Sequence, residues 1–128
     1  KAVEEINKGV DFIFINFANA DMVGHTARVT AIVKAIEVLD VELKKIIGAL
    51  DKAGGVALIT ADHGNAEINF DHATDAPHTA HTANPVPCLI TSRDYALRNG
   101  ELADIAPTIL SLLNLKTPSV MTGKSLIS

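Results

Sequence analysis

The chain has 128 residues, of which 48% are hydrophobic and 20% are charged, and its formal net charge is −4 at pH 7. This composition is that of an ordinary globular domain, and the absence of a long run of like charges excludes an extended basic surface for nucleic acid or a membrane. The sequence contains neither a recognisable signal peptide nor an apolar stretch long enough to span a bilayer, so we expect a cytoplasmic protein.

The first predicted elements are a helix, a strand and a second, longer helix. Residues 2–8 predict a short helix. Residues 11–17 are mostly apolar and rich in β-branched and aromatic side chains, which predicts a buried parallel strand. Apolar residues at three- and four-residue spacing over residues 29–50 predict one long amphipathic helix. The helix should stop at Gly54 and Gly55, because residues without a side chain readily adopt the left-handed backbone conformation that ends many helices.

The second half of the chain predicts two more strands and a helix. A strand is expected at residues 56–60, so that strand, helix and strand form a right-handed βαβ unit. Residues 66–82 are the longest predicted loop, polar and rich in histidine, and such length indicates a functional role. A third strand is predicted at residues 87–91 and a helix at residues 102–113, kinked or started by Pro107. We therefore expect an α/β fold with a mostly parallel sheet.

Side chains that bind metals follow the first two predicted strands. Asp21 and His25 come after the first, and Asp62 and His63 come directly after the second. Ligands in open α/β sheets bind at the carboxyl ends of strands. A helical turn would place Asp21 and His25 on one face. The adjacent side chains of Asp62 and His63 diverge, so this pair can hold one ion from two sides or reach two ions. Zinc and manganese accept carboxylate and imidazole ligands, and two ions about 4 Å apart can orient a phosphate and activate a hydroxyl nucleophile.

Each of these residues also has an ordinary structural explanation. An aspartate such as Asp21 in a polar loop is commonly a cap or turn residue. The Asp62-His63 pair is more specific, because burying both without a partner or an ion is costly. Cys88, the one cysteine, excludes an internal disulfide and reads as a small core residue. Three loop histidines are solvated by default, and spacing does not choose among them: His72, His78 and His81. Three asparagines are turn formers or donors to the ligands: Asn16, Asn19 and Asn65.

Five stretches, in this order and spacing, resemble the motifs of cofactor-independent phosphoglycerate mutases. They are NFANADMVGHT at residues 16–26, TADHGNAE at 60–67, HTAHTANPVP at 78–87, LADIAPTIL at 102–110 and MTGKSL at 121–126. The resemblance covers essentially the whole chain. It implies the alkaline-phosphatase-like superfamily and a three-layer αβα sandwich, of which this chain would be a part.

The resemblance also implies two manganese ions and a role for each candidate ligand. Asp21, His25 and His81 would hold one ion, while Asp62 and His63 would contribute to the other. His81 is chosen over His78 because the family's ligand precedes a Thr-x-Asn-Pro sequence. The reaction implied is the interconversion of 3-phosphoglycerate and 2-phosphoglycerate in glycolysis through a phosphoserine intermediate.

Important parts of that family are missing from this sequence. The nucleophilic serine and an aspartate of the second metal site belong to an N-terminal segment, and the substrate-binding arginines belong to an inserted domain. The arginines here match none of them, so the substrate-binding residues stay unknown: Arg28, Arg93 and Arg98. Because these parts are missing, the resemblance implies the C-terminal segment of a discontinuous phosphatase domain, inactive alone. A chain that starts at Lys1 and opens directly on a helix also indicates a fragment of something longer, or a domain boundary just upstream.

The same resemblance sets the expected partners and leaves two alternatives. The intact enzyme should be a monomer that binds phosphoglycerate and neither nucleic acid nor membrane, whereas the segment alone should self-associate through an uncovered apolar edge. One alternative is another phosphomutase or phosphatase of the superfamily, which would lack the full run at residues 16–25. The other is a non-catalytic metal-binding module.

Overall fold

A computed structural model describes residues 1–127. Within it the chain divides into two compact units. The first unit consists of Lys1–Gly55 and His63–Val86, and the second consists of Val56–Asp62 and the residues from Pro87 onward. None of the helices within residues 1–127 is long and apolar enough to cross a membrane.

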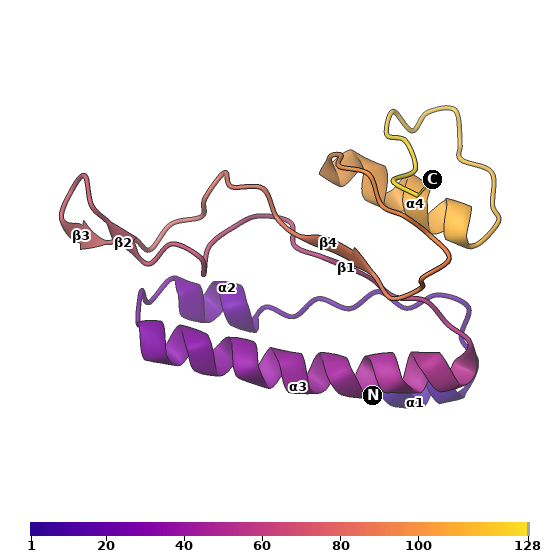
Figure 1. The fold of residues 1–128 in the computed structure, drawn as a ribbon, viewed down its shortest axis with the longest axis horizontal. Helices are drawn as coiled ribbons and strands as arrows, with labels where there is room; N and C mark the ends of the chain where they lie inside the picture. Colours follow the sequence, from indigo (N-terminus) through magenta and orange to yellow (C-terminus); the bar gives the residue numbers. More distant parts are fainter. Residues whose placement is uncertain (128) are drawn as a thin grey trace. The chain divides into compact units, whose positions relative to one another are not determined.

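The first unit is built on helices. Helices α1 (Ala2–Asn7) and α2 (Asn19–Gly24) both pack against the long helix α3 (Val29–Ala53) (Figure 1). The unit also contains a small hairpin of strands β2 (Phe70–Asp71) and β3 (Ala76–Pro77). The helices predicted at residues 2–8 and 29–50 are therefore confirmed, whereas the predicted loop at residues 66–82 contains a hairpin that its polar composition did not indicate.

Helix α3 ends as its sequence predicts. Gly54 adopts a left-handed conformation with φ of 70°, which costs glycine little because it has no Cβ. The N–H of Gly55 then donates to the carbonyl oxygen of Leu50 at 2.9 Å, a bond typical of this helix ending. Along the helix, Ile32 and Ala49 are buried. The periodic apolar face and the two glycines thus account for both the helix and its end.

The second unit combines a strand pair with a C-terminal helix. Strands β1 (Leu58–Thr60) and β4 (Cys88–Ile90) pair, and the short 3₁₀ helix η1 (Leu102–Asp104) leads into α4 (Ile105–Leu112). Pro107 lies in the first turn of α4, where its missing N–H removes no helical hydrogen bond. Cys88 is half-buried, and burial raises the pKa of its thiol, in agreement with a packing role.

Buried polar groups fasten the C-terminal segment to this helix. The Thr108 hydroxyl is fully buried, donates to the Asp104 carbonyl oxygen at 2.7 Å and accepts from the Leu126 N–H at 2.8 Å. The buried Asp104 carboxylate accepts from the backbone N–H groups of Lys124 and Glu101. These bonds, the first of them above all, hold the pKa of the Asp104 carboxyl below its ordinary value.

The mostly parallel sheet expected from the sequence is not confirmed. Both strand pairs within residues 1–127, β1 with β4 and β2 with β3, are antiparallel. The strand predicted at residues 11–17 is wrong for this structure, because no residue of that segment is in a strand. Phe12 and Phe14 are 50% and 80% exposed. An apolar sequence favours a strand, but a strand forms only where another strand supplies hydrogen-bonding partners.

Two glycines at the C-terminal end of α3 give opposite predictions for substitution by alanine. A Cβ at Gly48 would have no atom within 4 Å, so Gly48→Ala should raise the free energy of unfolding by about 0.5–1 kcal/mol through its better helix propensity. Gly54→Ala should lower it by about 1–2 kcal/mol, because alanine is strained at positive φ. Urea unfolding measures both, and equal effects of the two substitutions would contradict this account of the helix end.

Candidate metal centre

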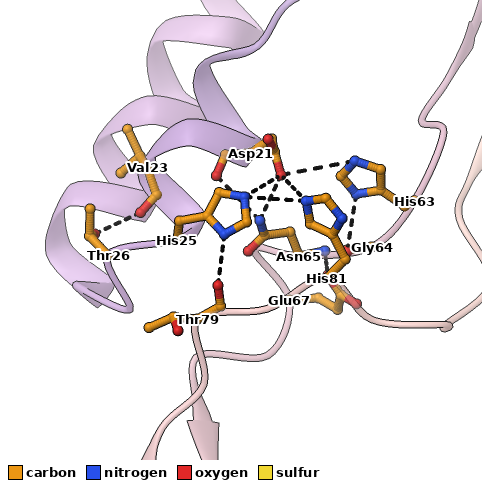
Figure 2. Close-up of polar contacts among 10 residues, drawn as sticks. All are labelled: Asp21, Val23, His25, Thr26, His63, Gly64, Asn65, Glu67, Thr79 and His81. Carbon is orange, nitrogen blue, oxygen red and sulfur yellow. Dashed lines mark hydrogen bonds and ion pairs between the residues drawn. The ribbon is translucent and has the colours of Figure 1, made fainter.

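Helix α2 presents two of the predicted ligands on one face. Asp21 lies in its first turn and His25 directly follows its last residue, so the two side chains are one helical turn apart. His25 Nε2 is 3.3 Å from Asp21 Oδ1 (Figure 2). The other ring nitrogen of His25, Nδ1, is 2.7 Å from the carbonyl oxygen of Thr79. Because a carbonyl oxygen only accepts, Nδ1 carries the proton and a neutral ring keeps its lone pair on Nε2.

His81 reaches the same place from a distant part of the chain. Its Nε2 is 3.0 Å from Asp21 Oδ1 and 3.2 Å from His25 Nε2, although His81 and His25 are 56 residues apart. Asp21, His25 and His81 are the residues that the family resemblance groups as ligands of one ion. They form the one set of three or more such residues within residues 1–127 whose ligand atoms all lie within 4.8 Å of one another. That they hold an ion stays a prediction. Two segments far apart in the sequence thus supply one cluster.

The spacing of these three atoms fits a metal ion. Bonds of 2.0–2.2 Å to one ion place neighbouring ligand atoms about 3.0–3.5 Å apart, and the three separations here are 3.0, 3.2 and 3.3 Å. A carboxylate oxygen and an imidazole lone pair are both acceptors, so only a proton or a cation satisfies them at such distances. One carboxylate and two imidazoles suit zinc, manganese or iron(II) and leave coordination positions for water or substrate.

His63 adds a third imidazole beside this cluster. Its Nε2 is 4.0 Å from Asp21 Oδ1, and its ring stacks on that of His81 with centroids 3.7 Å apart. Asp62, the next residue back, belongs to the second compact unit and is not in the three-residue group. The shared ion predicted for Asp62 and His63 therefore stays a prediction.

The other two loop histidines take no part in the group. His72 contacts Phe70 edge-on in the β2–β3 hairpin, with ring centroids 5.1 Å apart. The His78 N–H donates to the Asn69 carbonyl oxygen at 3.1 Å, and its side chain is half-buried. The structure thus separates His81 from His78 by position, which spacing along the chain did not do.

The Asp21 carboxylate is held in its ionised form. Its pKa is lowered, first of all by a hydrogen bond from the Asn65 side chain. Metal binding requires a deprotonated carboxylate, so this hydrogen bond favours the form that binds.

The loop that carries His81 is fastened by Glu67. The Thr82 N–H donates to the Gly64 carbonyl oxygen at 2.9 Å, which pairs the two segments. The Glu67 carboxylate accepts from the Thr82 hydroxyl, from Asn84 Nδ2 at 3.0 Å and from the Asn65 N–H at 2.7 Å. These bonds, the one from Thr82 above all, lower the pKa of Glu67 to about 2. Sequence reasoning gave Glu67 no role, and the TADHGNAE motif was the only signal that pointed to it.

Comparisons with known proteins are consistent with this chemistry. A family model described as the metalloenzyme superfamily matches residues 1–117. The chain is 53% identical over 128 residues to a 2,3-bisphosphoglycerate-independent phosphoglycerate mutase of Rhodopseudomonas palustris, an alignment that covers 99% of this chain and 25% of that protein. It is 51% identical over 128 residues to the enzyme of that name from Roseobacter denitrificans, covering 98% and 25%.

A third relative is similar to a comparable degree. The 2,3-bisphosphoglycerate-independent phosphoglycerate mutase 2 of Methanosarcina barkeri is 54% identical over 130 residues, an alignment that covers 99% of this chain and 25% of that protein. The chain thus spans about a quarter of the length of the curated relatives it matches.

The lowered pKa of Glu67 predicts an acid-dependent contribution to stability. A carboxyl whose pKa is about 2 in the folded chain, below its ordinary 4.5, stabilises the fold above pH 4.5 and loses that effect as the pH falls towards 2. Glu67→Gln keeps the shape but not the charge, so it should lower the unfolding midpoint at pH 7. The difference from the parent, followed by urea unfolding from pH 7 to pH 2, should shrink below pH 4.5. A difference that stays constant over this range would contradict the role of the Glu67 carboxylate in fastening the loop of His81.

Proposed function

The chain belongs to the metalloenzyme superfamily, and on that basis we propose that it supplies part of the two-metal site of a phosphoglycerate mutase. The intact enzyme would interconvert 3-phosphoglycerate and 2-phosphoglycerate. The single observation that carries the proposal is the cluster of Asp21, His25 and His81, since it has the donors and spacing that a divalent ion requires. The similarity to phosphoglycerate mutases over nearly all of this chain supports this particular reaction.

The proposed ligands divide between two ions. Asp21 Oδ1, His25 Nε2 and His81 Nε2 would hold the first, and Asp62 and His63 would contribute to the second. Bound divalent ions, which we propose to be manganese, would neutralise phosphate charge and lower the pKa of a hydroxyl nucleophile. Binding requires lone pairs on the two histidines, and the Thr79 carbonyl oxygen supports this by keeping the proton of His25 on Nδ1.

The chain's own residues would act by holding the metal ligands in place. Glu67 and Thr82 keep the His81 loop against the segment that carries His63. The residue that attacks the phosphate would be a serine in another segment of the protein, phosphorylated and then dephosphorylated during the reaction. The 128 residues alone should therefore show no mutase activity.

The domain organisation is part of the same proposal. The chain would be the C-terminal segment of a discontinuous phosphatase domain, a three-layer αβα sandwich with a mostly parallel sheet, interrupted by an inserted domain. Its share of about a quarter of its relatives' length supports this. We propose a cytoplasmic, monomeric intact enzyme, and self-association of the chain alone through exposed side chains such as Phe12 and Phe14.

Titration of the chain with Mn²⁺ or Zn²⁺ tests the proposed site. The parent should bind, and His81→Ala should weaken binding at least about tenfold, since it removes one of three ligands. His72→Ala is the matched control, because His72 lies in the same loop but outside the group, and it should leave the affinity unchanged. Failure of the parent to bind, or equal affinity of parent and His81→Ala, would contradict the proposed site.

A further inference from the structure

The side chain of Asn65 is buried against the proposed ligand Asp21. It is 5% exposed, the lowest exposure of any polar residue of the first unit within residues 1–127. Its Nδ2 donates to Asp21 Oδ1 at 2.7 Å and lies 3.3 Å from the Asp21 carbonyl oxygen (Figure 2). One amide group thus contacts both the carboxylate and the backbone of a residue 44 positions away.

Gly24 makes this approach possible. A Cβ at Gly24 would lie 2.3 Å from Asn65 Oδ1 and 2.7 Å from Asn65 Cγ, much closer than a real Cβ tolerates. Gly24 is itself buried, at the end of α2. On the other side, the Asn65 N–H donates to the Glu67 carboxylate at 2.7 Å. The Asn65 side chain is therefore buried against the last turn of α2, and its own backbone is tied to Glu67.

The oxygen that Asn65 contacts is the one that faces the histidines. Asp21 Oδ1 lies 3.0 Å from His81 Nε2 and 3.3 Å from His25 Nε2. A carboxylate on a helix surface can rotate about two side-chain bonds, and each oxygen accepts more than one hydrogen bond. A hydrogen bond from Asn65 to Oδ1 favours one orientation of the Asp21 carboxylate. The other lone pair of Oδ1 then points towards the imidazoles. Partners of this kind commonly change metal affinity 10- to 100-fold.

We propose that Asn65 is a positioning residue, whose buried amide orients the Asp21 carboxylate towards the metal ion while Gly24 leaves the space it needs. This inference rests on the metal site proposed above. The competing explanation is that Asn65 only ties its loop to α2 and affects folding rather than the ligand.

Two substitutions break the contact in different ways. Asn65→Leu keeps a similar branched shape but removes the donor. Gly24→Ala keeps Asn65 but displaces its side chain, although alanine by itself favours a helix. Gly48→Ala is the matched control, since it makes the same change in a helix where nothing is within 4 Å.

Co²⁺ is the probe, because its visible absorption reports both affinity and the arrangement of ligands. We expect Asn65→Leu and Gly24→Ala to weaken Co²⁺ binding by the 128-residue chain about tenfold and to change the spectrum of the bound ion. Combined, they should weaken it no further than either alone, since both remove one contact. The Gly48→Ala control should match the parent in affinity and spectrum.

The remaining outcomes separate the two explanations. Unchanged affinity and spectrum in both variants would overturn the positioning role and leave the metal site standing. A second result would also overturn the positioning role: weaker Co²⁺ binding with an unchanged spectrum, in proportion to a lower unfolding midpoint of the metal-free variant. It would show that Asn65 only ties its loop to α2. No Co²⁺ binding by the parent would instead reject the proposed function on which the inference rests. If Asn65→Leu does not fold, the result for Gly24→Ala alone decides between the two explanations.

Discussion

The Asp21 carboxylate is the point at which the separate segments of the first unit meet. One of its oxygens lies within 4.0 Å of a nitrogen of three different histidines, His25, His63 and His81, and accepts a hydrogen bond from Asn65. Without a negative charge at this position, imidazoles stacked at 3.7 Å would gain little from being so close and would repel one another when protonated. The close approach of these three imidazoles to one another is therefore tied to a single ionised group, the Asp21 carboxylate.

The surroundings of that carboxylate divide into support from the helix and support from the loop. Helix α2 fixes Asp21 and His25 through the regular spacing of one helical turn. The loop has no such regularity, and it depends on the Glu67 carboxylate and on the pairing of Gly64 with Thr82. A Cβ at Gly64 would lie 2.2 Å from the Thr82 hydroxyl and 2.3 Å from Glu67 Oε1, so the close approach requires glycine there. Gly64, Thr82 and Glu67 thus set the position of the loop that carries His81.

The elements that the sequence predicted correctly are those encoded by local pattern. The apolar periodicity of α3, its glycine end and the four-residue spacing of Asp21 and His25 each depend on residues close together in the chain. The strand expected at residues 11–17 failed because its hydrogen-bonding partners must come from elsewhere, and apolar composition alone cannot provide them.

The candidate site shows the same limit. His78 and His81 share one loop, and only family resemblance favoured His81, which the structure then places within ligand distance of Asp21. The role of Glu67 was not predicted, because its partners Thr82 and Asn84 lie 15 and 17 residues further along the chain. Asn65 was expected to be either a turn former or a donor, and burial against α2 supports the second role. Long-range contacts of this kind leave no periodic signal in a sequence.

The most direct test of the central claim is the position of a bound ion. A crystal of the chain grown with Mn²⁺ and measured at the manganese absorption edge should show an anomalous peak about 2.0–2.2 Å from Asp21 Oδ1, His25 Nε2 and His81 Nε2. A bound ion located away from these three atoms, or no peak at a saturating Mn²⁺ concentration, would contradict the account.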